Sequence, residues 1–148
     1  MYNTTKEEVG RIRKLRKALS ETEKRCVDRI EKLDDIYFDL NKFNIRPDAQ
    51  IQVNKAIIIM EKCPNLKFVA SSFTDSRGSS EYNRKLSQRR ANSVVTYILS
   101  NSSLESERII GVGYGESGLK NQCYNGVKCS EREHQANRRT EIEVSIKK

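Results

Sequence analysis

Residues 74–94 read TDSRGSSEYNRKLSQRRANSV, and they join a polar loop to a long helical pattern. Apolar residues recur at helical spacing here, which predicts a helix over residues 80–100. Its apolar face would consist of Leu86, Val94, Val95, Ile98 and Leu99. Asp75 precedes this helix in the loop, directly after a predicted strand, so its carboxylate can face the helix.

Asn83 and Arg90 are seven residues apart, so they share one face of that helix, with Leu86 between them. This face offers an amide, an apolar contact and a guanidinium opposite the carboxylate of Asp75. Such a set could bind a zwitterionic ligand, since a carboxylate holds an ammonium and a guanidinium holds a carboxylate through two hydrogen bonds. The spacing is equally compatible with an internal Asp75–Arg90 salt bridge that only fixes the loop to the helix.

On both sides of this stretch, strand-like and helical patterns alternate. Strands are predicted at residues 36–40, 66–70, 108–112 and 140–146, a helix beginning at Pro47 over residues 47–62, and a long loop over residues 113–136. The inward face of the helix at 47–62 would consist of Ile51, Val53, Ile57, Ile58 and Met60. After an N-terminal helix, this β-α-β-α-β-β order predicts an α/β (α+β) sandwich, a mixed sheet with helices packed on one face.

Residues 1–35 have the apolar spacing of a helix, and a capping-box pair, Ser20 and Glu23, predicts a break or restart near Ser20. The first twenty residues carry six Lys or Arg and two Glu, a local charge of +4. They could form a basic arm for nucleic acid. We favour a linker helix or a coiled-coil seam, which could also form a homodimer, because no aromatic residue is interleaved with the basic ones for base stacking. We therefore expect a helical linker over residues 1–34, a globular domain over residues 35–148, and no nucleic acid as partner.

The 148 residues carry a formal net charge of +8, with 32% charged and 36% hydrophobic residues. This is enough apolar material for one modest core. No stretch approaches the roughly 18–20 apolar residues that span a bilayer, and the start lacks a signal-peptide pattern. We expect either a cytoplasmic protein or a piece of an exported one. The positive charge fits a soluble basic surface or an anionic partner, and it does not discriminate between them.

The four cysteines and the single histidine do not form a zinc-binding pattern. Cys123 and Cys129 lie six residues apart in a polar loop, on either side of an Asn–Gly turn. This spacing suits a short-loop disulfide, which would require an oxidising compartment, but two free thiols in a cytosolic loop are the alternative. Whether Cys26 and Cys63 pair stays open, because only their distance decides it.

Sequence signatures of catalysis are largely absent. A histidine-dependent triad has only His134 available, and a phosphate-binding Gly-Lys-Ser/Thr loop is missing. The glycine-rich residues 111–115 are followed by a polar loop, whereas a dinucleotide-binding loop lies directly between a strand and a helix. We therefore expect a non-enzymatic binding protein without a cofactor or a metal.

Residues 74–94 fit the spacing Thr-Asp-x-x-Gly-x-x-x-Tyr-Asn-x-x-Leu-Ser-x-x-Arg-Ala-x-x-Val. This spacing resembles the signature of OmpA-like peptidoglycan-binding domains. Flanking segments extend the resemblance to about residues 33–148: YFD at 37–39, IRP at 45–47, GVGYGE at 111–116 and NRRTE at 137–141. The resemblance implies the OmpA-like fold and a non-catalytic, wall-binding function. The cysteine-bearing insert before Asn137 is similar to versions from Bacteroidetes-type bacteria.

The resemblance also implies a ligand and the residues that bind it. The aspartate of the signature, here Asp75, would hold the free amino-acid end of diaminopimelate in the stem peptide of peptidoglycan, and the arginine, here Arg90, would bind its carboxylate. Further pocket positions of the family match Thr74, Asn83, Leu86 and Arg138. Arg139 is expected to be structural instead. Where the family has a glycine before the Thr-Asp pair, this chain has Ser72, which would narrow the pocket or tune its specificity.

By the same resemblance, the protein is expected in the periplasm, attached to the outer membrane, as a domain excised from an exported protein. Its partners would be peptidoglycan and an outer-membrane domain or protein upstream of residue 1. The domain would anchor the outer membrane, or the attached protein, to the cell wall.

Overall fold

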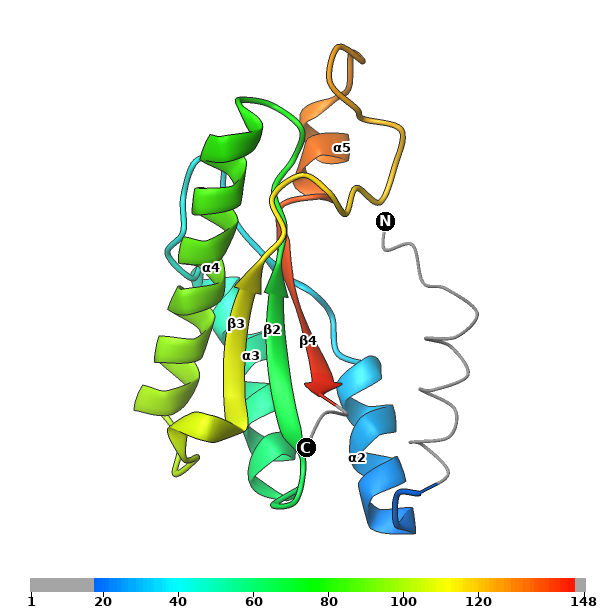
Figure 1. Cartoon of the computed structure of the whole chain (residues 1–148), viewed down its shortest axis with the longest axis vertical. Coiled ribbons are helices and arrows are strands. Elements are labelled where there is room, and N and C mark those ends of the chain that lie inside the picture. The colour runs from blue at the N-terminus through cyan, green and yellow to red at the C-terminus, as the bar shows by residue number, and fades with distance from the viewer. Residues whose placement is uncertain (1–17, 146–148) are drawn as a thin grey trace.

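The computed structural model describes residues 18–145, which form an open sheet with helices packed against it (Figure 1). In chain order the elements are α2 (Glu21–Glu31), β1 (Ile36–Tyr37), α3 (Pro47–Glu61), β2 (Lys67–Ser72), α4 (Ser80–Ser100), the 3-10 turn η1 (Ser106–Arg108), β3 (Ile109–Gly113), α5 (Glu131–Gln135) and β4 (Arg139–Ser145). The predicted order of strands and helices is confirmed, with α5 as an addition. Within the described residues, no helix is both long enough and apolar enough to cross a membrane.

The four strands form one mixed sheet in the order β1-β4-β2-β3. β2 and β3 are parallel, and α4 connects them along the chain. β4 lies antiparallel to both β1 and β2, with Thr140 opposite Ser72. The end of β2 and the start of β4 therefore meet at the same end of the sheet. This pairing brings the loop of residues 73–79 next to Arg138, although the two are far apart in the sequence.

One face of the sheet carries the core. Phe68 on β2 and Ile109 on β3 are almost fully buried, whereas the next residue on β3, Ile110, is 57% exposed. This alternation follows from the two-residue repeat of a strand. Residues of α3 and α4 belong to the same core cluster: Val53, Ile57, Met60, Val94 and Ile98. The predicted sandwich, with these helices on one face of the sheet, is confirmed.

The inward face of α3 differs from the predicted face at two positions. Val53, Ile57 and Met60 are buried as expected, but Ile51 and Ile58 are 57% and 55% exposed. These two isoleucines are seven residues apart, so both lie on the outer face of the helix. The inner face instead includes Ala49 and Ala56. The prediction was wrong because it selected large apolar side chains and did not consider the direction in which each one points from the helix axis.

Two other segments differ from the prediction, one in its length and one in its secondary structure. β1 is shorter than the strand predicted at residues 36–40, since the backbone leaves the sheet after two residues and turns at Asn41, where φ is 59°. The loop predicted over residues 113–136 contains the short helix α5. A capping box formed by Ser130 and Glu133 begins this helix.

The N-terminal helix is described from Glu21 onward as α2. The capping box predicted at Ser20 and Glu23 is present, because each residue's backbone N–H donates to the other's side chain, at 3.0 and 3.1 Å. The side chains of α2 that join the core are Cys26, Val27 and Ile30. The proposed basic arm and most of the coiled-coil seam fall in residues 1–17, outside the described residues. The domain boundary after residue 34 stays a prediction.

Two disulfides cross-link the described chain. The predicted bond between Cys123 and Cys129 is present, with Cα atoms 6.0 Å apart. The pair left open by the sequence, Cys26 and Cys63, also forms a disulfide. This second bond ties α2 to the end of α3, so the N-terminal helix is covalently attached to the core.

Removing the Cys26–Cys63 bond is expected to destabilise the protein more than removing the Cys123–Cys129 bond. A disulfide restricts the unfolded chain more when it closes a longer loop. The expected losses are about 4 kcal/mol for a sequence separation of 37 and about 2 kcal/mol for a separation of 6. Denaturant unfolding of the two double Cys→Ser variants measures both losses. A larger loss for the short loop would contradict this ranking.

Candidate functional site

A polar pocket of about 250 Å³ opens where β2 ends and β4 begins. The structure brings all six predicted ligand residues to its lining: Thr74, Asp75, Asn83, Leu86, Arg90 and Arg138. The other lining residues are Leu40, Asn41, Arg77, Gly78 and Tyr82. The pocket therefore joins the loop after β2, the first turns of α4 and the residue before β4.

The loop between β2 and α4 is held in place by the helix that follows it. Ser79 caps α4 through its side-chain oxygen. Asn83, one turn further, is buried, and its Nδ2 donates to the carbonyl of Arg77 at 3.0 Å. Gly78 has a φ of +91°, a conformation that other residues rarely adopt. These features hold the loop, and with it Asp75, against the start of α4.

Arg90 is fully buried, and its guanidinium donates to three backbone carbonyls. Nε contacts Lys42 O at 2.8 Å, and Nη2 contacts Asp39 O at 3.1 Å. Nη1 contacts Phe73 O at 3.2 Å. These bonds use three of the five N–H donors of the group. Burial, and then repulsion from Arg138, lower the pKa of Arg90 to about 10.

No carboxylate among residues 18–145 lies at salt-bridge distance from Arg90, so the suggested Asp75–Arg90 salt bridge is absent. Asp75 instead pairs with Arg77 at 2.8 Å and with Arg138 at 3.1 Å. Burial alone would raise the pKa of Asp75, but hydrogen bonds from Arg77 and Arg138 outweigh it and hold the pKa below its usual value. Asp75 is therefore charged at neutral pH, while the cation on Arg90 has no direct counter-ion in the described part of the chain.

Glu131 extends this network from the first residue of α5. Its carboxylate contacts Arg77 Nη1 at 3.2 Å and Arg138 Nη1 at 3.0 Å. Arg138 is further fixed by its Nε, which donates to Phe38 O at 2.9 Å. The two guanidinium groups therefore have a carboxylate on each side. Asp75 is the buried one, and Glu131 is the exposed one.

Thr74 offers the pocket a hydroxyl without a partner. Its Oγ1 is buried and makes no hydrogen bond within the described part of the chain, although its backbone N–H donates to Gly115 O at 2.8 Å. Buried polar groups are nearly always paired. Because Thr74 lines the pocket, a bound ligand would supply the missing partner.

Ser72 and Arg139 both lie outside the pocket lining. Ser72 is buried, and its hydroxyl hydrogen-bonds the hydroxyl of Thr140 on β4 at 2.6 Å. The expectation that Ser72 narrows the pocket is therefore not met, since its side chain is engaged between strands. Arg139 donates to Gly118 O at 2.8 Å and lies 4.1 Å from the centre of the Phe73 ring. Its contacts are structural, as expected.

A larger hollow of about 770 Å³ lies between α2 and β4, but it contains none of the predicted ligand residues. Its charged lining residues are Glu23, Glu31, Asp34, Asp35, Lys67, Glu141 and Glu143. This predominantly acidic lining repels a ligand carboxylate. The smaller pocket is therefore the better candidate site for such a ligand.

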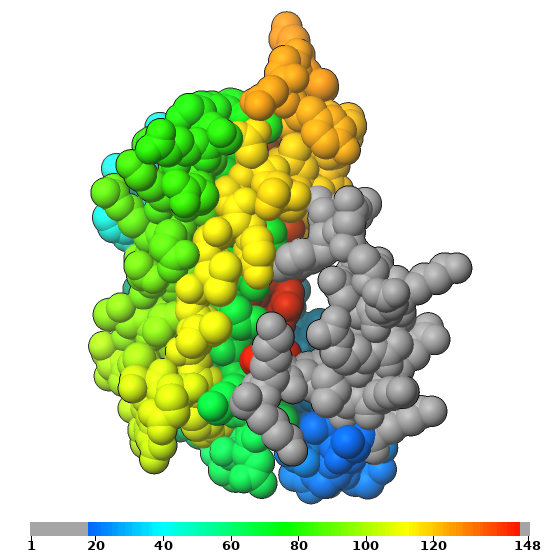
Figure 2. All heavy atoms as spheres, in the orientation of Figure 1, coloured from blue at the N-terminus to red at the C-terminus, as the bar shows by residue number. Residues whose placement is uncertain are grey.

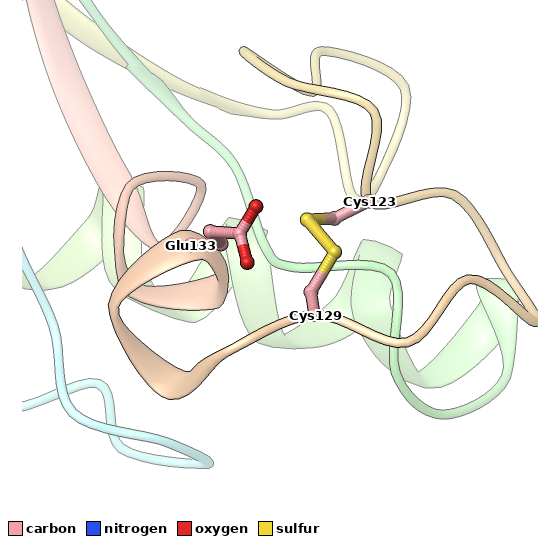
Figure 3. Close-up of side chains that lie close together, drawn as sticks. All are labelled: Cys123, Cys129 and Glu133. Atoms are coloured by element: carbon pink, nitrogen blue, oxygen red, sulfur yellow. A yellow bond between two sulfur atoms is a disulfide. The ribbon is translucent and has the colours of Figure 1, made fainter.

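Cys123, Cys129 and Glu133 lie close together, with their potential ligand atoms within 4.8 Å of one another (Figure 3). The thiolate is the form of cysteine that binds a metal. Since both sulfurs are joined in a disulfide, neither is a thiolate here. The cluster closes the loop before α5 and does not make a metal centre in this state.

Comparison with known families agrees with this geometry. Residues 37–133 match the family model described as OmpA family. The chain belongs to the OmpA family. The matched segment contains every predicted pocket residue except Arg138, which follows it by five positions. The OmpA-like signature predicted over residues 74–94 is therefore confirmed.

The first curated relatives that this OmpA-family domain matches are longer proteins. Outer membrane porin F of Pseudomonas aeruginosa is 34% identical over 83 residues, which cover 56% of this chain and 24% of the porin. The chain thus spans about a quarter of the length of the first curated relatives that it matches.

Solved structures confirm the predicted OmpA-like fold. The peptidoglycan-associated lipoprotein from Burkholderia pseudomallei matches with a TM-score of 0.65 at 22% identity, over 75% of this chain and 89% of that chain. The cell wall anchor of the T6SS from Pseudomonas aeruginosa matches with a TM-score of 0.57 at 21% identity, over 73% of both chains. At these identities the likeness establishes the fold alone.

Two charged residues of this OmpA-family site were not predicted from the sequence. Arg77 follows Asp75 by two positions, and this short spacing between opposite charges in a tight loop could have indicated the ion pair. Glu131 lies in a segment that was predicted as loop. The capping-box pattern of Ser130 and Glu133 could have identified the helix that presents it.

Proposed function

We propose that this domain binds peptidoglycan non-covalently through the diaminopimelate of its stem peptide. The observation that carries this proposal is the buried guanidinium of Arg90, which lines the pocket beside the charged Asp75 and has no counter-ion among residues 18–145. Burying a charge costs much free energy unless the charge is both hydrogen-bonded and paired with an opposite charge. The free amino-acid end of diaminopimelate carries a carboxylate and an ammonium next to each other, so it complements both residues.

In the proposed complex, the ligand carboxylate lies against Arg90, whose two remaining N–H donors form charge-assisted hydrogen bonds. The ligand ammonium lies against the carboxylate of Asp75. The unpaired Oγ1 of Thr74 takes one further hydrogen bond. Leu86, at the wall of the pocket, contacts the aliphatic part of the ligand.

Asn83 and Arg138 support this arrangement from two sides. Asn83 Nδ2 contacts the carbonyls of Asp75 and Arg77 at 3.4 and 3.0 Å. Arg138 contacts the Asp75 carboxylate and lines the pocket itself. The charged groups are thus held in place before a ligand arrives, which reduces the entropy that binding costs.

The proposed role of the domain is to anchor an outer-membrane protein to the cell wall, without catalysis. Two structures with the same fold are named as a peptidoglycan-associated lipoprotein and a cell wall anchor, and their names support this role. In this proposal, residues 35–148 bind the wall in the periplasm. Residues 1–34 link them to an outer-membrane domain or protein upstream, and they could also form a homodimer.

Retention on purified, insoluble peptidoglycan tests the proposal. We expect Asp75→Ala to weaken retention by about tenfold or more, because a hydrogen bond to a charged group contributes about 1.5–3 kcal/mol. Asp28→Ala removes an exposed carboxylate on α2 and should be retained like the wild type. Equal retention of Asp75→Ala and the wild type would reject the site.

A further inference from the structure

The charged residues around the pocket differ sharply in exposure. The side chains of Asp75 and Arg138 are each 4% exposed, whereas that of Glu131 is 63% exposed. Glu131 nevertheless contacts the same nitrogen of Arg138, Nη1, that contacts Asp75. A guanidinium that lines the pocket is therefore capped from the solvent side by one of the protein's own carboxylates.

Glu131 reaches this position because the insert before β4 is tied to the pocket loop. The Cys123–Cys129 disulfide closes the insert two residues before Glu131 (Figure 3). Ser76 Oγ donates to Cys123 O at 2.5 Å, which joins the insert to the loop after β2. In Figure 2 the segment before α5, in orange, projects from the end of the molecule near the start of α4, in green. The contact with the pocket therefore comes from an exposed part of the chain.

We propose that Glu131 is a built-in competitor for a ligand carboxylate at Arg77 and Arg138. A carboxylate of the wall peptide has the same charge and the same paired oxygens as Glu131, so it fits the two guanidinium groups that Glu131 bridges. Because Glu131 is exposed, water readily solvates its carboxylate after displacement. The identity of the competing ligand rests on the proposed function above.

The charges around the pocket support displacement rather than joint binding. Among the described residues at this site, three guanidinium groups, of Arg77, Arg90 and Arg138, face two carboxylates. A ligand carboxylate that bound Arg138 beside Asp75 and Glu131 would place a third negative charge at the same nitrogen, and the other two would repel it. When Glu131 leaves, the number of carboxylates at this nitrogen stays at two, and α5 loses its contact with Arg77.

Acetate titration of the full chain tests the role of Glu131 without peptidoglycan. The nitrogen NMR signal of the Arg138 Nε–H group reports binding. Glu131→Gln removes the charge and keeps the length of the side chain, and Glu21→Gln removes an exposed carboxylate that also forms an ion pair, with Lys24. We expect Glu131→Gln to bind acetate about fivefold more tightly than either the wild type or Glu21→Gln. This factor corresponds to the upper end of the free energy that an exposed ion pair contributes. Equal or weaker acetate binding would overturn the proposal.

Retention on peptidoglycan then connects this competitor to the wall. We expect Glu131→Gln to need less peptidoglycan than the wild type for half-maximal retention. Tighter acetate binding without increased retention would overturn the claim that a wall carboxylate occupies this position. If the wild type and Asp75→Ala are retained equally, the proposed function fails, while the acetate titration still decides whether Glu131 competes.

Discussion

Replacing Arg90 with alanine is expected to lower the free energy of unfolding by about 3–5 kcal/mol and to remove binding to peptidoglycan. The buried guanidinium donates to the carbonyls of Asp39, Lys42 and Phe73. Without it, the three carbonyls lose this donor, although Asp39 O keeps a hydrogen bond from Lys42 N–H at 3.1 Å. A buried polar group that loses its partner costs about 1–3 kcal/mol. Denaturant unfolding measures the stability effect, and retention on peptidoglycan measures the binding effect.

Two further variants separate stability from binding. Arg90→Lys keeps a positive charge but replaces the planar guanidinium with a single ammonium. We therefore expect it to lose less stability than Arg90→Ala, while its binding to peptidoglycan is still weaker than that of the wild type. Arg89→Ala removes the neighbouring exposed arginine and should change the free energy of unfolding by no more than about 0.5 kcal/mol. A loss for Arg90→Ala no larger than that for Arg89→Ala would contradict the assigned contacts.

Gly113→Ala is expected to destabilise the domain by about 3 kcal/mol, because α4 packs directly against this position of β3. A Cβ there would lie 2.7 Å from Gln88 Cα and 2.6 Å from Ser87 Oγ, and it would also meet the backbone nitrogen of Gln88. Backbone atoms cannot move aside without a shift of the helix. Since α4 carries Asn83 and Arg90, such a shift should also weaken retention on peptidoglycan. Denaturant unfolding and retention measure the two effects.

Gly126→Ala is a matched control for that substitution. A Cβ at Gly126 meets nothing within 4 Å, although φ is +86°. The expected cost is therefore backbone strain alone, about 1 kcal/mol, with retention unchanged. A loss of unfolding free energy for Gly113→Ala no larger than that for Gly126→Ala would contradict the tight packing of α4 against β3.

The types and order of the main elements could be predicted because their apolar residues repeat with the period of a strand or a helix. The order of strands within the sheet could not. It depends on the pairing of Ile36 with Thr140 and of Ser72 with the same residue. Such long-range contacts leave no periodic signal. The exposed Ile51 and Ile58 on α3 show a second limit, since apolar content alone does not give the face that is buried.

The residues of the pocket could be predicted from the signature, but their electrostatic relations could not. The spacing of Asp75 and Arg90 was compatible with a salt bridge between them. In the structure, Arg90 instead donates to backbone carbonyls whose positions depend on the turn after β1. The actual partners of Asp75 are Arg77 and Arg138. Arg138 lies 63 residues away along the chain and reaches the site only through the pairing of β2 with β4.

A crystal structure of the full chain soaked with diaminopimelate is the most direct test of the central claim, that this pocket binds the zwitterionic end of a wall peptide. We predict the ligand carboxylate within hydrogen-bond distance of Arg90 and the ligand ammonium within hydrogen-bond distance of Asp75. A pocket without ligand at saturating diaminopimelate, or a ligand bound only elsewhere on the surface, would contradict the claim.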